Sequence, residues 1–241
     1  MQEPSHLVLA ALGFPLWLRI SHYLNLLFIG LLIRSGIQIL GAHPRLYWND
    51  GCTPKSEWMK FTRREVPLED KQVSTAHDDE VEVPAWLGLP GGKNLGLGCH
   101  WHGVTTTFWL LNGLIYVVLL FATDQWARLI PTSWEIFPDA WHSLTEYLTL
   151  HIPPLSAFHP YDPLQQLTYA VVVFLLGPLM LLTGTTMSPA IAARFPWYLK
   201  LFGGRQRARS LHFLGMVAFA LFTLVHTVLV LLAHFRQNMF V

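Results

Sequence analysis

Histidines are the residues of this 241-residue chain that most clearly suggest chemistry, and there are twelve of them. A neutral imidazole binds a transition metal through one ring nitrogen. Ionisable side chains inside apolar segments are costly to place and therefore point to function. Four of the twelve, His22, His102, His212 and His226, lie in long apolar segments at depths suited to holding a metal. We take these four as candidate metal ligands.

The spacing of the last two is informative. His212 and His226 are 14 residues apart. On an α-helix this places the two rings about 40° apart on one face, with a rise of roughly 21 Å. A helix with one imidazole near each of its ends can hold two stacked porphyrins, if other helices supply the second ligands.

The elements that must position these side chains are membrane spans. Hydrophobic residues make up 52% of the chain and charged residues 13%, against about a quarter charged in an ordinary soluble domain. Four stretches reach the length of about 20 apolar residues that a bilayer requires: residues 16–40, 102–121, 164–187 and 211–235. We expect an all-α fold, a single domain over 1–241 forming a transmembrane four-helix up-down bundle, with loop 41–98 outside the membrane.

The alternation of such a bundle predicts which imidazoles meet. Spans two and four enter the membrane from the same side, and His102 and His212 each lie at the start of their span. These two histidines therefore lie at the same membrane face, and we pair them. His22 lies at the other face and is left for His226. Two imidazoles on one haem iron close both axial positions, which favours electron transfer over oxygen chemistry.

Haem propionates need cations. Arg19 precedes His22 by one helical turn, and Arg205 and Arg209 lie in the turns before His212. We expect these three arginines to pair with propionates.

The remaining histidines give weaker signals. His100 rivals His102 but would lie on another helix face. Solvent exposure is the favoured interpretation for those in loops, which are His77, His142, His151 and His159.

Several classes of function are disfavoured. The net charge of +1 offers no basic field to nucleic acid. Two cysteines are too few for a thiolate cluster held by this chain alone. We find no catalytic triad, P-loop or dinucleotide fingerprint in a suitable context, so substrate chemistry would belong to a partner.

Several segments resemble the di-haem cytochrome b family that includes the membrane subunits of thiosulfate reductase, formate dehydrogenase and nickel–iron hydrogenase. The likeness is nearest to the branch paired with sulfite-oxidase-like molybdopterin proteins. It is carried by Arg19-Ile20-Ser21-His22-Tyr23-Leu24-Asn25, by Gly41-Ala42-His43-Pro44-Arg45-Leu46-Tyr47-Trp48, by Trp101-His102 with Leu111-Asn112-Gly113-Leu114-Ile115-Tyr116, by Leu182-Thr183-Gly184-Thr185-Thr186-Met187-Ser188-Pro189, and by Phe202-Gly203-Gly204-Arg205-Gln206-Arg207-Ala208-Arg209-Ser210-Leu211-His212.

The resemblance implies two haems b on the four histidines and an exchangeable quinone. The family's quinone segment is matched only partly here, by Tyr161, Asp162, Gln165 and Gln166. Asp162 has an alternative role, as the start of an Asx-Pro turn before the third span.

The resemblance also implies a multi-pass protein of the bacterial inner membrane, with its amino end in the cytoplasm. Loops one and three, which carry 12 Lys and Arg, would then lie outside, whereas the positive-inside rule favours the reverse. In the family's orientation Cys52 and Cys99 share the oxidising side, where a disulfide would brace loop one.

Together these features predict an electron carrier between a quinone pool and a redox partner, either a molybdopterin oxidoreductase or a c-type cytochrome. Two alternatives stay open. One is a haem-free membrane anchor or transporter whose histidines bind a metal ion or relay protons. The other is a haem b protein that reduces metal ions by itself.

Overall fold

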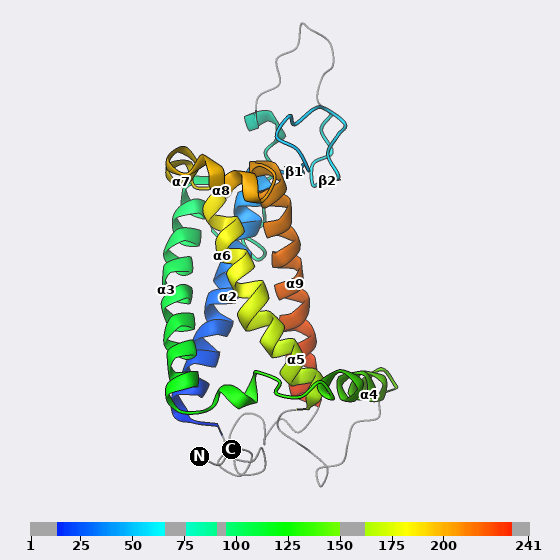
Figure 1. The fold of residues 1–241 in the computed structure, drawn as a ribbon. Coiled ribbons are helices and arrows are strands. Elements are labelled where there is room, and N and C mark those ends of the chain that lie inside the picture. The colour runs from blue at the N-terminus through cyan, green and yellow to red at the C-terminus, as the bar shows by residue number, and fades with distance from the viewer. Residues whose placement is uncertain (1–13, 66–75, 91–94, 150–161, 233–241) are drawn as a thin grey trace, which may run out of the picture. The chain divides into compact units, whose positions relative to one another are not determined.

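The fold is all-α, with one short two-stranded ribbon (Figure 1). It is seen in a computed structural model, which describes residues 14–65, 76–90, 95–149 and 162–232. The four long apolar helices predicted from the sequence are present and are long enough to cross a membrane. They are α2 (Leu16–Ala42), α3 (Leu95–Ala122), a third span made of α5 (Pro163–Val171), the π-helical η4 (Val172–Leu176) and α6 (Gly177–Thr186), and α9 (Arg205–Leu232).

Shorter elements connect these helices. Strands β1 (Arg45–Leu46) and β2 (Met59–Lys60) pair antiparallel, with Arg45 opposite Lys60. The others are η1 (Ala76–Asp79), η2 (Trp126–Arg128), α4 (Ile136–Leu148), α7 (Pro189–Arg194) and α8 (Pro196–Leu201).

The chain divides into two compact units, and each long helix contributes to both. The first comprises Met1–Tyr23, Asn112–Pro178 and Ala218–Val241, and the second comprises Leu24–Leu111 and Leu179–Val217. His22 and His226 both belong to the first unit. His102 and His212 both belong to the second.

Each unit buries small polar side chains and exposes large apolar ones on its long helices. In the second unit, Ser35 and Thr183 are fully buried, whereas Phe108 is 55% exposed. In the first, Ser21 is 4% exposed and Leu114 60%. This distribution suits helices that face lipid and pack through small residues.

Two helices begin earlier than the apolar pattern predicted. Helix α3 begins at Leu95 instead of residue 102, and α9 begins at Arg205 instead of 211. The start of α9 has a long-range cap, because the Asp50 carboxylate accepts the backbone N–H groups of Arg205 and Gln206 at 3.2 and 2.7 Å. A carboxylate at this end also complements the helix dipole. His102 and His212 therefore lie about two turns inside their helices.

The segment between the second and third spans has exposed aromatic side chains. Helix α4 buries Ala140 and Ser143 on one face, and Trp141 on it is 68% exposed. Trp134, just before the helix, is 85% exposed. The segment thus has the amphipathic helix and aromatic residues expected at a membrane surface.

Candidate haem sites

In the first unit, the structure brings together His22 on α2 and His226 on α9. Their ring centroids are 5.9 Å apart and the rings are inclined at 63°. The hydroxyl of Tyr169, on α5, lies 3.2 Å from Nδ1 of His226. Phe222, one turn before His226 on α9, stacks on the same imidazole at 5.5 Å. These contacts fix the orientation of the His226 ring.

In the second unit, His102 on α3 and His212 on α9 form a similar pair. Their ring centroids are 6.2 Å apart and the rings are inclined at 68°. A hydroxyl lies at Nδ1 of each ring. Ser35 on α2 is 2.9 Å from Nδ1 of His102, and Thr183 on α6 is 3.1 Å from Nδ1 of His212.

A glycine leaves room for one ring of this second pair. A Cβ added at Gly184 would lie 3.2 Å from Cε1 of His212, closer than ordinary van der Waals contact. One added at Gly36 would lie 3.7 Å from Cε1 of His102, which is an ordinary van der Waals contact. The Thr183-Gly184 dipeptide therefore supplies a hydroxyl to the imidazole and leaves space for it.

The separation within each pair fits a haem iron. An imidazole nitrogen lies about 2 Å from a bound metal and its ring centre roughly 1 Å further, so rings sharing one iron lie about 6 Å apart. The observed 5.9 and 6.2 Å agree with this value. The histidines are also too far apart to pair by a hydrogen bond of their own.

Two buried polar atoms near the first pair are available to an anion. Nε of Arg19 and Oγ of Ser21 are buried and make no hydrogen bond to the part of the chain that the structure describes. Both residues are within one turn of His22. The main-chain carbonyl of Ser21 accepts a hydrogen bond from Nδ2 of Asn112 at 3.1 Å, which ties α2 to α3. A propionate at this position would satisfy the unpaired Arg19 donor.

The two arginines predicted to serve the second haem have protein partners. Arg205 donates to the carbonyl of Met187 at 2.8 Å. Arg209 donates to the carbonyls of Arg45, at 2.9 Å, and His43. Each guanidinium has five N–H groups, so these bonds leave donors for another acceptor.

Side chains of the predicted quinone segment have structural roles. Asp162 caps α5 by accepting the N–H of Leu164 at 2.8 Å, as the alternative interpretation expected. The buried Gln166 donates to the carbonyl of Ala127 at 2.8 Å. Gln165 is hydrogen bonded to Tyr147. Tyr161 lies outside the described residues.

Other predictions from single residues have mixed outcomes. His100 is exposed and its ring contacts Trp101 rather than another histidine. His142 is exposed and lies 3.7 Å from Glu146. Cys52 and Cys99, which the sequence left open as a disulfide pair, are free thiols in the structure. Of the other loop histidines, His151 and His159 lie outside the described residues, as does the side chain of His77.

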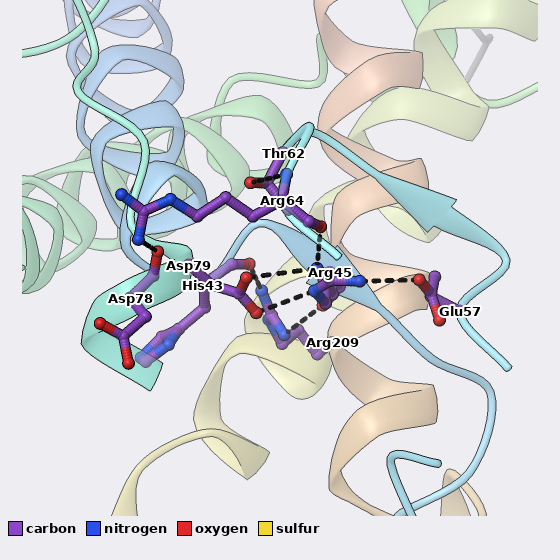
Figure 2. A network of polar contacts seen from close by, with 8 residues as sticks. All are labelled: His43, Arg45, Glu57, Thr62, Arg64, Asp78, Asp79 and Arg209. Carbon is purple, nitrogen blue, oxygen red and sulfur yellow. Dashed lines mark hydrogen bonds and ion pairs between the residues drawn. The ribbon is translucent and has the colours of Figure 1, made fainter. Parts of the chain in front are cut away.

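A buried ion-pair network orders loop one in the second unit (Figure 2). Arg45, 7% exposed, pairs with Glu57 and Asp79, each at 2.8 Å. The hydrogen bond with Asp79 raises the pKa of Arg45. Loop one also makes hydrogen bonds to α9, because Ser210 accepts from the Trp58 indole at 2.9 Å and donates to the carbonyl of Tyr47 at 2.7 Å. Loop one is thereby attached to the start of α9.

Sequence reasoning missed the residues that contact the imidazoles. Ser35, Thr183 and Tyr169 were not predicted as site residues. Spacing along the sequence relates residues on one helix, and it does not show which hydroxyl on one span will contact a histidine on another. The signal present was a small-residue pattern, Thr183-Gly184, within a segment already noted for its resemblance.

The family is identified by comparison with known proteins. The chain belongs to the prokaryotic cytochrome b561 family, whose model matches residues 13–240, and is accordingly a multi-pass membrane haem protein of an electron-transfer class. It is similar to a protein of Azospira oryzae named putative protein-methionine-sulfoxide reductase subunit YedZ1, with 26% identity over 220 residues, 90% of this chain and 89% of the relative. No solved structure matches the chain significantly.

Proposed function

We propose that this protein carries two haems b and passes electrons between a quinone pool and a partner oxidoreductase. One haem is held by His22 and His226, and the other by His102 and His212. The observation that carries the proposal is the separation of the two imidazole pairs, 5.9 and 6.2 Å between ring centroids. Two histidines 14 residues apart on α9 each meet a histidine from a different helix.

The protein's contribution is to hold the imidazoles and tune their environment. A haem iron with two imidazole ligands takes up and releases one electron without an open coordination position. Tyr169, Ser35 and Thr183 orient three of the rings. Arg19 provides positive charge beside His22. These side chains orient ligands or supply charge, and none of them takes part in a chemical step.

The donor set favours haem over a protein-bound metal ion or a proton relay. No group of three His, Cys, Asp or Glu side chains that could hold an ion occurs within the described ranges. The sequences of the four long helices also contain no Asp or Glu. A bound ion would have only two imidazoles at either place, too few for the four-coordinate sites that zinc prefers.

The partner we propose reduces an oxidised methionine side chain. This follows from the name of the Azospira oryzae relative, a putative subunit of a protein-methionine-sulfoxide reductase. Reduction of a sulfoxide to a thioether consumes two electrons and two protons and releases water. The haems would supply the electrons one at a time, and a molybdopterin centre of the partner would accumulate the pair. A c-type cytochrome is the other partner class implied by the family resemblance.

The donor we propose is a quinol in the inner membrane. Asp162 and Gln166 already make structural hydrogen bonds. Gln165 is hydrogen bonded too, to Tyr147, so a quinone bound at that face would have to share or replace one of these contacts. Loops one and three are the proposed docking surface for the partner.

The function is tested by reducing the purified haem protein with decylubiquinol and following the α-band absorbance. Subunits copurified from native membranes are identified and then added with methionine sulfoxide. We expect quinol to reduce the haems, and the partner with its substrate to reoxidise them. Haems that quinol does not reduce, or that stay reduced when partner and sulfoxide are present, would contradict this route.

A further inference from the structure

We infer that Ser35 and Thr183 are positioning residues that hold His102 and His212 in the Nδ1-protonated form and thereby set the potential of one haem. The inference rests on the proposed haem between these two histidines. It adds residues on α2 and α6, helices that contribute no ligand to this haem, and it assigns them a measurable effect on one of the two haems.

The direction of each hydroxyl hydrogen bond follows from proton counting. A hydroxyl has one proton to donate and lone pairs to accept with. Ser35 donates its proton to the carbonyl of Leu31 at 2.8 Å, and Thr183 donates to Leu179 at 2.7 Å. Each bond joins residues i and i−4 of one helix, a common arrangement for buried Ser and Thr. A carbonyl oxygen cannot donate, so O···O separations of 2.8 and 2.7 Å place the hydroxyl proton between the two oxygens, and each hydroxyl oxygen then accepts from the neighbouring imidazole.

The proton must therefore be on Nδ1 of both rings. The His102 ring also makes a hydrogen bond to the backbone of Leu32, and the His212 ring to that of Met180, each three residues before the hydroxyl residue. The Nε2 atom of each ring is then unprotonated, which is the state that binds iron.

Both hydroxyls are inaccessible to water, which makes their bonds persistent. Ser35 and Thr183 are each 0% exposed. Water cannot replace the lost partner if a hydroxyl is removed, so the imidazole would lose an acceptor. The first pair differs, because His226 faces the phenol of Tyr169 and His22 has no back-bonded hydroxyl among its contacts in the described residues.

An accepting group at Nδ1 increases the basicity of a metal-bound imidazole. A more basic ligand stabilises the ferric form and lowers the midpoint potential. Removing the Ser35 or Thr183 hydroxyl should therefore raise the potential of the haem at His102 and His212. The haem at His22 and His226 should keep its potential, so it acts as an internal reference.

The test is an optical redox titration of the purified, full-length Ser35→Ala and Thr183→Val proteins. We expect two haems, one with a raised midpoint potential and one unchanged. Thr183→Ser keeps the hydroxyl and should behave as the native protein. Thr107→Val is the matched control, since Thr107 donates to the i−4 carbonyl of Gly103 but is exposed.

The outcomes separate this inference from the proposed function. Unchanged potentials in both hydroxyl variants, or an equal rise in Thr107→Val, would overturn the inference while leaving the haems in place. If Thr183→Val loses a haem while Thr183→Ser retains both, the result supports a role for the hydroxyl. If Thr183→Ser also loses a haem, the result counts against the inference. A native protein without haem would instead refute the proposed function.

Discussion

The imidazoles of His102 and His212 lie 6.2 Å apart, centroid to centroid, and a buried hydroxyl from a third or fourth helix meets Nδ1 of each ring. His102 comes from α3 and His212 from α9. Four helical segments of one unit therefore converge on a single pair of rings. Such convergence fixes ligand orientation before any cofactor binds, which reduces the ordering cost of binding.

The space beside His212 depends on the absence of a side chain at Gly184. A Cβ there would lie 3.2 Å from Cε1 of His212, so Gly184→Val should push the ring aside. We expect Gly184→Val to lower the occupancy of the haem at His102 and His212, with a smaller effect for Gly184→Ala. A pyridine haemochrome assay on the purified proteins measures the haem-to-polypeptide ratio.

A matched glycine is available on α3. A Cβ at Gly103 would meet no atom within 4 Å. Gly103→Ala should therefore retain both haems, and the helix should gain about 1 kcal/mol of stability from the change. Equal haem loss in the Gly103 and Gly184 variants would rule out a specific role for the space at Gly184.

Arg19 should affect the potential of the haem at His22 and His226. Its Nε is buried without a partner in the described chain, and a cation near propionates favours the reduced iron. Arg19→Gln should retain this haem but lower its midpoint potential in a redox titration. Arg205→Gln should lower the potential of the other haem, by less, because the Arg205 guanidinium already donates to Met187. Unchanged potentials would exclude propionate pairing by these arginines.

The sequence allowed prediction of the spans, and it placed His22 with His226 and His102 with His212. Both followed from properties that are local or periodic: apolar length, helical spacing and the alternation of a bundle. The starts of α3 and α9 were predicted about two turns late. The length of an apolar stretch does not reveal a capping residue that is distant in sequence. Asp50 is such a residue, and it stabilises the first turn of α9.

The same limit applies to side-chain partners. That Arg209 would donate to carbonyls of loop one depends on where residues 43–45 fold, which local sequence does not determine. The sequence showed only that Cys52 and Cys99 would share one side of the membrane, which permits a disulfide without requiring it. Bond formation requires Cβ atoms about 4 Å apart, and the fold leaves both thiols free.

Arg45 should control the order of loop one without affecting haem content. Removing one partner of a buried ion pair costs about 3–5 kcal/mol, because the other charge is left uncompensated, and Arg45 pairs with both Glu57 and Asp79. Arg45→Ala should make loop one much more sensitive to protease and exchange its amides faster, with both haems retained. Lys60→Ala, at the exposed residue opposite Arg45 in the ribbon, is the control. Equal sensitivity in both variants would refute the role of the ion pairs.

Acidification should loosen the same loop through His43. Partial burial lowers the pKa of His43, Arg209 and Arg205 lower it further, and Glu80 opposes them. The unfolded segment therefore binds a proton more readily than the folded one, so the stabilisation is present above about pH 6.5 and is lost as pH falls through the folded pKa.

The measurement is limited proteolysis of loop one at pH 7.5 and pH 5.5, for the native protein and His43→Gln. We expect cleavage of the native protein to accelerate at pH 5.5, and His43→Gln to show less acceleration under the same conditions. Comparing the two proteins at each pH corrects for the pH dependence of the protease. The same acceleration in both would show that other groups are responsible.

The most direct test of the account is the number of haems per polypeptide in the native protein and in four histidine variants. We predict two haems in the native protein and in His100→Ala, and one haem in each of His102→Ala, His212→Ala and His226→Ala. The haem that remains in His226→Ala should differ in potential from the one that remains in His212→Ala. A colourless native protein, or two haems surviving in His102→Ala, would contradict the assignment of the two imidazole pairs as haem ligands.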